Sequence, residues 1–108
     1  FAAAAAPGVA IGVDLELSDR AKPADLLTGG FSDAERTMLI SSGASVLHAW
    51  CAKEAAAKCL GTGFNNAPLG FTVTAMDAQG ATVNGPDQPG IRVALAERAV
   101  AVLAVAFV

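Results

Sequence analysis

The stretch Val46-Leu-His-Ala-Trp-Cys-Ala-Lys-Glu-Ala-Ala-Ala-Lys-Cys-Leu60 decides the fold of this chain. Alanine, lysine and glutamate dominate it, and these residues have a high intrinsic preference for helix. Ser45 precedes the stretch as an N-cap, and Gly61 follows it as a natural C-terminal stop. The sequence therefore predicts one long helix over Val46–Leu60.

The charged residues of this helix fall on two neighbouring faces. Trp50, Glu54 and Lys58 are four residues apart and share one stripe, whereas Lys53 lies about 100° around the helix from Glu54. A stripe that holds a large aromatic residue usually faces the protein body. Its charges would then be half buried, which favours a functional site. The alternative is an ordinary surface ion pair between Glu54 and Lys58.

Upstream, residues Val9–Leu17 alternate and contain β-branched side chains, which predicts a strand. On a strand, Asp14 and Glu16 project to the same face. Two neighbouring carboxylates repel each other, and a divalent cation would relieve that repulsion. Magnesium prefers such hard oxygen ligands, and Glu54 would supply a third acid. The alternative interpretation is a solvated strand face.

The remaining elements complete an α+β pattern. Ser32-Asp-Ala-Glu35 is a capping box that predicts a shorter helix ending at Ser41 or Ser42, before Gly43. Four strands are expected over Gly70–Met76, Ala81–Asn84, Ile91–Ala96 and Ala99–Phe107, with turns at 77–80, 85–90 and 97–98. We expect a small antiparallel sheet packed on the long helix and the shorter helix, with 1–8 as a linker and 9–108 as one domain.

Composition limits the partners of this domain. Hydrophobic residues make up 54% of the 108 residues and charged residues 16%, which predicts an apolar surface meant for a partner or a neighbouring domain. The net charge of -3 gives no general attraction for nucleic acid, so any phosphate binding must rest on local charge. The chain begins at Phe1, and we expect it to be processed or excised from a longer protein.

The two cysteines and the C-terminal apolar run predict a cytoplasmic protein without a membrane anchor. Cys51 and Cys59 are separated by about 12 Å of helical rise, too far for a disulfide. They are expected to be reduced packing residues. The run 99–108 is too short to cross a membrane as a helix. His48 is expected to be an ordinary surface or core residue.

Two motifs together resemble a known family. Gly12-Val-Asp-Leu-Glu16 and Trp50-Cys-Ala-Lys-Glu-Ala-Ala-Ala-Lys58, in this order, are similar to motifs of the 4'-phosphopantetheinyl transferases. Arg20, Phe31-Ser-Asp-Ala-Glu35 and Gly61-Thr-Gly63 fit the same pattern. The resemblance implies Mg²⁺-dependent transfer of the phosphopantetheine arm of coenzyme A to a serine of an apo acyl or peptidyl carrier protein. Such a holo-[acyl-carrier-protein] synthase releases 3',5'-ADP and serves fatty acid or polyketide biosynthesis.

The resemblance also implies metal ligands and a catalytic base. Asp14, Glu16 and Glu54 correspond to the family's Mg²⁺ ligands, and the ion would bridge the pyrophosphate of coenzyme A. Glu54, directly or through a metal-bound water, would take the proton from the carrier serine.

The resemblance implies two lysines as phosphate ligands, and Arg20 is a further basic candidate. Lys58 would contact the phosphate being transferred, and Lys53 would support the pyrophosphate. Arg20 would reach a phosphate or an acid of the carrier protein; the alternative is a solvated arginine.

One family motif is absent. The family carries a serine-histidine pair that contacts coenzyme A, but alanines and a glutamate stand at its expected place within Val93–Arg98. In the family's larger layout this pair lies in an upstream half. We therefore expect the C-terminal half of a two-half transferase, or a domain excised from a synthase, that needs a second half-domain or self-association. The alternatives are a non-catalytic, degenerate domain with a structural role in a polyketide or fatty-acid synthase, and an unrelated α+β domain.

Overall fold

The computed structural model describes residues 10–17, 28–64, 67–98 and 101–108. The expected linker over 1–8 and the predicted site residue Arg20 lie outside these ranges. The described elements are β1 (Ile11–Leu17), α2 (Asp33–Ser42), α3 (Val46–Cys59), a single 3-10 turn η1 (Pro68–Gly70), β2 (Thr72–Met76), β3 (Gly80–Gly85), β4 (Gln88–Arg98) and β5 (Ala101–Phe107). The predicted α+β class is confirmed.

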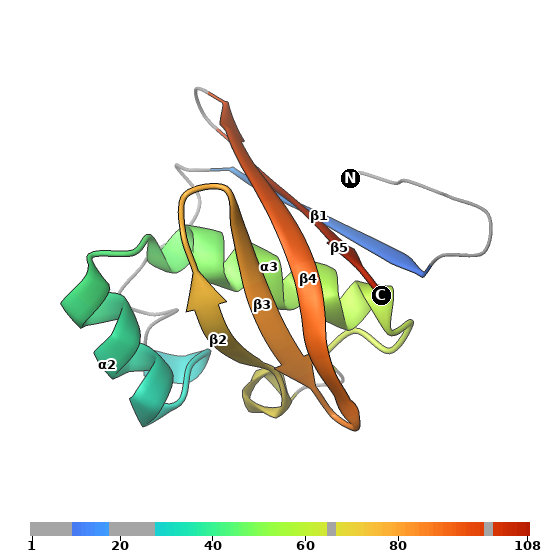
Figure 1. Cartoon of the computed structure of the whole chain (residues 1–108), viewed down its shortest axis with the longest axis horizontal. Helices are drawn as coiled ribbons and strands as arrows, with labels where there is room; N and C mark the ends of the chain where they lie inside the picture. Colours follow the sequence, from blue (N-terminus) through green and yellow to red (C-terminus); the bar gives the residue numbers. More distant parts are fainter. Residues whose placement is uncertain (1–9, 18–27, 65–66, 99–100) are drawn as a thin grey trace.

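The strands form one five-stranded sheet in the order β1-β5-β4-β3-β2, and every neighbouring pair is antiparallel. The first and last strands lie side by side, from Ile11 opposite Phe107 to Leu17 opposite Ala101. Helix α3 runs across one face of this sheet, with α2 beyond its N-terminal end (Figure 1). No helix in the described part of the chain is long and apolar enough to cross a membrane.

Small residues let α3 lie very close to β1. Ala49, Ala52, Ala55 and Ala56 are fully buried on the helix. At Gly12 of β1, an added Cβ would lie 2.1 Å from the carbonyl oxygen of Ala55, closer than any real contact. Only glycine allows this approach. The approach brings the acidic residues of β1 against the middle of α3.

The helix ends follow their predicted signals. Ser32 caps α2, and its hydroxyl accepts from Glu35 N while the Glu35 carboxylate accepts from Ser32 N, so the capping box is present. Gly43 ends this helix with φ of 69°. Ser45 caps α3 by accepting from His48 N. Gly61 follows the end of α3 with φ of 77°.

Two expected turns are wrong in their position. β4 begins at Gln88, inside the stretch predicted as a loop, because Gly85 and Gln88 already pair across a tight turn that places Asp87 at φ of 58°. β4 also continues through Arg98, where a turn was predicted, because Arg98 pairs with Ala101 on β5. Cross-strand pairing overrides the local turn preference at both places.

The two faces of the sheet differ in what covers them. On the face toward α3, the side chains of β4 and β5 alternate into a fully packed core: Ile91, Val93, Leu95, Val102, Ala104 and Ala106 are buried. The opposite face, which we call the open face, carries Leu15 at 41% exposure and Phe107 at 39%, with Leu103 and Val105 half-buried between them. This apolar surface accounts for part of the hydrophobic excess in the composition.

Candidate active site

Three carboxylates meet between β1 and α3. Asp14 and Glu16 project from β1 toward the helix, and Glu54 projects from α3 toward the strand; one oxygen of each lies within 4.8 Å of the others. We call these three residues the acidic cluster. The strand alternation and the glycine contact at Gly12 produce this meeting. The structure therefore brings together the three residues that were predicted as metal ligands.

Burial and mutual repulsion make the acidic cluster reluctant to carry its full negative charge. The pKa of Glu16 is raised to about 7, first by burial and then by the closeness and charge of Asp14 and by the charge of Glu54. Burial, followed by the charge of Asp14, also raises the pKa of Glu54. Proximity of like charges disfavours ionisation, and a bound cation reverses that effect.

Asp14 provides a direct test of whether a metal ion fits. Its side chain is 5% exposed, and its Oδ2 atom is buried without a hydrogen-bond partner. Buried polar atoms in proteins nearly always have partners, so an orphaned carboxylate oxygen needs an explanation. A cluster of three carboxylates offers only hard oxygen donors, which suit Mg²⁺. The residues present therefore fit a magnesium ion.

Lys58 lies at the edge of the acidic cluster. Its Nζ donates to Oδ1 of Asp14 at 2.8 Å, while its side chain is 49% exposed. Burial lowers the pKa of Lys58, but the hydrogen bond and charge of Asp14, with the charges of Glu54 and Glu16, outweigh burial and raise it. The ammonium thus pairs across to β1 rather than only along its own helix.

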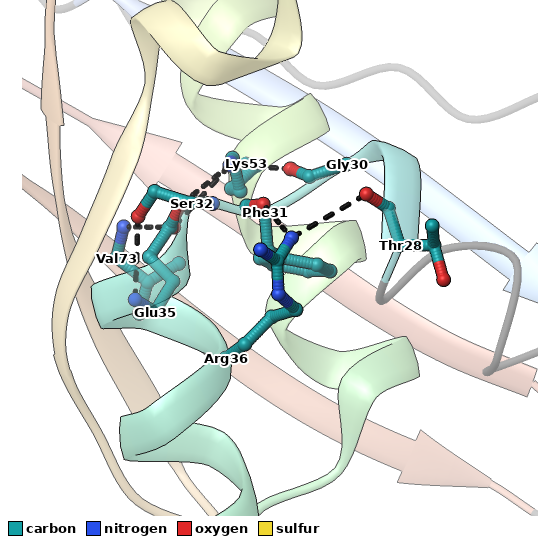
Figure 2. Close-up of polar contacts among 8 residues, drawn as sticks. All are labelled: Thr28, Gly30, Phe31, Ser32, Glu35, Arg36, Lys53 and Val73. Atoms are coloured by element: carbon teal, nitrogen blue, oxygen red, sulfur yellow. Dashed lines mark hydrogen bonds and ion pairs between the residues drawn. The ribbon is translucent and has the colours of Figure 1, made fainter.

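The structure does not bring Lys53 to the acidic cluster. Figure 2 shows its ammonium between Glu35 and Gly30: it donates to the two Glu35 oxygens at 3.1 and 3.2 Å and to the carbonyl of Gly30 at 2.7 Å. It also lies 4.6 Å from the centre of the Phe31 ring. Lys53 is 0% exposed, so the expected support of a pyrophosphate does not fit this geometry.

Lys53 lies away from the acidic cluster because of its angular offset from Glu54 along α3, which turns Lys53 toward α2 while Glu54 faces β1. Burial lowers the pKa of Lys53, and the charge of Glu35 opposes that shift.

Glu35 is a residue whose importance the sequence did not reveal beyond the capping box. Its carboxylate, 1% exposed, accepts hydrogen bonds from Ser32 N at 2.9 Å and Val73 N at 2.8 Å in addition to those from Lys53 (Figure 2). One side chain thereby joins α2, α3 and β2. No local pattern links residues this far apart in the sequence, so only the fold could reveal the pair.

A row of aromatic rings includes Trp50, which lies beside Glu54 of the acidic cluster. The ring of Trp50 packs edge-on against Phe31, with 6.2 Å between centroids, and packs at a tilt against Phe64 at 5.2 Å. The Phe64 ring is in turn tilted against Phe71 at 5.7 Å. A hydrogen bond from the Trp50 side chain also acts to lower the pKa of Glu54, against the larger effect of burial. The stripe of α3 that holds Trp50 therefore faces the protein body, as its composition predicted.

The other candidates lie away from the cluster or serve packing. His48 Nε2 lies 3.6 Å from Glu97 Oε2, outside the cluster. Cys51 and Cys59 are free and buried, and Cys51 Sγ donates to the backbone oxygen of Asp14 at 3.4 Å. Burial raises the pKa of Cys51 strongly. Both cysteines are packing residues that hold α3 on β1.

Comparison with known proteins gives the family. The family model described as the 4'-phosphopantetheinyl transferase superfamily matches residues 10–105, which is most of the chain and includes every described site residue. Among curated proteins, none matches this chain. The five-stranded antiparallel sheet with two helices is compatible with that family's fold. The chain therefore belongs to the 4'-phosphopantetheinyl transferase superfamily.

Proposed function

We propose that this chain provides the metal-binding part of a transferase that moves the 4'-phosphopantetheine arm of coenzyme A onto a serine of an apo acyl or peptidyl carrier protein. The reaction would release 3',5'-ADP, as in a holo-[acyl-carrier-protein] synthase. The observation that carries the proposal is the acidic cluster, with its orphaned Asp14 oxygen and with Lys58 beside it. The family match supports phosphopantetheine transfer in general.

Asp14, Glu16 and Glu54 would hold Mg²⁺. When bound, this ion would neutralise charge on the pyrophosphate of coenzyme A. The contribution of the chain itself is to hold three carboxylates in place before the substrate arrives. Burial between β1 and α3 does this, because the strand lies in close contact with the helix at Gly12.

Glu54 is suited to accept the proton from the carrier serine. Its raised pKa, caused first by burial, makes the carboxylate a better proton acceptor than a solvated glutamate. The Trp50 side chain, which lies beside this carboxylate on α3, would help to orient it. As the serine Oγ bonds to the phosphorus, its proton passes to Glu54, and the bond from phosphorus to the oxygen of 3',5'-ADP breaks.

Lys58 would contact the phosphoryl group during transfer. Its ammonium is half-exposed at the edge of the acidic cluster, and the acids raise its pKa and keep it charged. A fixed positive charge beside the transferred group stabilises the charge that develops there. Arg20 is proposed as a further phosphate or carrier contact. We do not propose such a role for Lys53, because its ammonium is fully buried on Glu35.

A second unit would complete the site. In the described strand β4, Val93 and Leu95 point into the core and Ala94 and Ala96 lie on the open face, so this segment offers no serine or histidine to coenzyme A. We propose that an upstream half-domain or another copy of the chain packs on the open face and reaches around β1, the edge strand of the sheet, to supply that contact. Coenzyme A and carrier proteins as substrates suit a cytoplasmic enzyme of fatty acid or polyketide biosynthesis.

The decisive experiment is carrier loading followed by mass spectrometry. The chain, coenzyme A, Mg²⁺ and an apo carrier protein should give a carrier heavier by one phosphopantetheine arm, with an upstream half added if the chain alone is inactive. Asp14→Asn should lower the rate by about 100-fold or more, because it removes the negative charge of one proposed metal ligand without changing the shape of the side chain. Glu97→Gln, which removes an exposed acid of β4, is the matched control and should leave the rate unchanged. Full activity of Asp14→Asn would refute the metal assignment.

A non-catalytic structural domain is the second candidate, favoured by the lack of a serine-histidine pair in β4. Coenzyme A binding separates the two functions. A catalytic half-site should bind coenzyme A only with Mg²⁺ present, whereas a purely structural domain should not bind it under either condition.

A further inference from the structure

The ammonium of Lys58 contacts the same carboxylate that would ligate a metal ion. We propose that Lys58 is a built-in counter-ion of Asp14 that competes with the divalent cation, so that cation binding releases Lys58 toward the incoming phosphate. This inference rests on the proposed metal role of the acidic cluster. It adds that the cation and the lysine take turns on one carboxylate.

Asp14 needs a positive partner whenever it is ionised. Its side chain is 5% exposed, and a buried carboxylate is costly unless it is paired. In the described part of the chain, the ion pair of Asp14 is with Lys58, at 2.8 Å on Oδ1. Oδ2 remains without a partner. The lysine thus neutralises the charge of Asp14 but forms a hydrogen bond with only one of its two oxygens. The other oxygen remains available to a metal ion.

Lys58 is free to leave, unlike the other lysine of α3. Its side chain is 49% exposed and stands in the last turn of the helix. A lysine there can swing its ammonium into water while its aliphatic stem stays on the helix. Lys53, by contrast, is 0% exposed and held by Glu35 and Gly30. The helix therefore carries one fixed lysine and one movable lysine.

A cation in the acidic cluster and the ammonium on Asp14 exclude each other electrostatically. Lys58 interacts with the charges of all three acids. A cation bound in the cluster would lie a few ångström from the Lys58 ammonium, and the repulsion between the two positive charges would be strong in this partly buried setting. The ammonium would move outward but remain tethered at the rim, where it can pair with an anion. Anion binding at the rim should therefore be stronger after the cation is bound, which is a positive coupling between the two.

Mn²⁺ affinity, measured by the paramagnetic resonance signal of the free ion, tests this competition without any activity assay. Lys58→Met keeps the aliphatic stem and removes the competing charge, so it should bind Mn²⁺ tighter by on the order of tenfold. Arg92→Met is the matched control, because it changes the net charge equally from an exposed position on the open face. It should leave the affinity unchanged. Equal or weaker binding by Lys58→Met would overturn the inference.

The same Mn²⁺ measurement distinguishes a failure of the proposed function from a failure of this inference. A wild-type chain that binds no Mn²⁺ would refute the metal site and this inference together. Wild-type binding with no gain in Lys58→Met would refute the inference alone.

A measurement on the wild-type chain guards against misfolding of the variant. The chain has three lysines, Lys22, Lys53 and Lys58, so a lysine-labelled sample gives few side-chain nuclear magnetic resonance signals. Titration with Mg²⁺ should shift the Lys58 signals toward those of a solvated lysine, with saturation, and leave those of Lys53 unchanged. Lys58 signals that keep their starting position at saturating Mg²⁺ would overturn the inference.

Discussion

At the scale of single residues, the site is defined by how differently its charged side chains are paired. Asp14 is buried with one oxygen on Lys58 and the other without a hydrogen bond. Glu16 and Glu54 are half-buried beside it, and their pKa values are raised. Such paired shifts in one cluster are typical of catalytic or metal sites rather than of solvated acids.

The raised pKa of Glu16 predicts a pH-dependent stability in the absence of divalent ions. Its pKa is about 7 in the folded chain against an ordinary value of 4.5 for a glutamate, so the folded state binds more protons between these two pH values. The free energy of unfolding should therefore fall as pH rises through this window. Urea denaturation at pH 5 and pH 8 measures the change. Glu16→Gln should show a smaller fall, and adding Mg²⁺ at pH 8 should restore stability to the wild type. A wild-type stability that rises with pH would contradict the assignment.

At the scale of elements, two contacts determine the site: the ion pair that links α2 to α3, and the close contact of α3 with β1. The first is Lys53 with Glu35, both within the core. The second is Gly12 against Ala55 and Cys59. The first fixes the rotation of α3, and the second fixes its distance from the acids of β1.

Removing one member of the buried ion pair should be costly. Lys53→Met leaves the Glu35 carboxylate buried without its cation, so we expect a loss of about 3–5 kcal/mol in the free energy of unfolding. Urea denaturation measures it. The double variant Lys53→Met, Glu35→Gln should recover part of the loss, because the glutamine is neutral and its single amide oxygen keeps one of the two hydrogen bonds from Ser32 N and Val73 N. A double variant less stable than Lys53→Met would show that the pair does not act as proposed.

Filling the contact between β1 and α3 should damage stability and metal binding together. The Cβ of Gly12→Ala would lie 2.1 Å from the Ala55 oxygen, so β1 must shift away from the helix, at about 1–3 kcal/mol or more. That shift separates Asp14 and Glu16 from Glu54 and should weaken Mn²⁺ binding. Gly70→Ala is the control, since its Cβ would meet only the Pro86 side chain at an ordinary 3.6 Å. Unchanged Mn²⁺ affinity in Gly12→Ala would disprove the link.

At the scale of the whole molecule, α3 covers one face of the sheet (Figure 1), and among the described residues the other face is the apolar open face. Leu15 opposes Leu103 there, and Phe107 extends the apolar surface to the end of β5. Contiguous apolar area of this kind typically marks an interface. It lies on the side of β1 opposite the acidic cluster, so a partner can cover it without filling the cluster.

A charge on the open face should block assembly. We expect the wild-type chain to self-associate or to bind an upstream half, and Leu15→Lys to remain a monomer in analytical ultracentrifugation because a lysine there would be desolvated. Ile40→Lys, at a 69% exposed position of α2, is the control and should assemble like the wild type. A monomeric wild-type chain that loads carriers fully by itself would refute the need for a partner.

The elements were predictable because their signals are local. The capping box of α2, the caps of α3 and the alternation of β1 each act within a few residues, and each element lies where these signals predicted. The start and the end of β4 were not predictable, because they depend on the pairing of Gly85 with Gln88 and of Arg98 with Ala101, which forms only when the strands meet in the sheet.

The acids of the site were also accessible from the sequence alone. Their spacing of two on a strand and their motif partner on a helix determined which residues would form a cluster and what metal they suit. The different fates of Lys53 and Lys58 were not accessible, since both are lysines on one helix in similar contexts. Only the packing of α2 and β2 around α3 decided that Lys53 is buried on Glu35 while Lys58 reaches Asp14 and water. The sequence determines the type of each side chain, but the burial and the ion pairing of that side chain depend on which segments, far apart in the sequence, pack against each other.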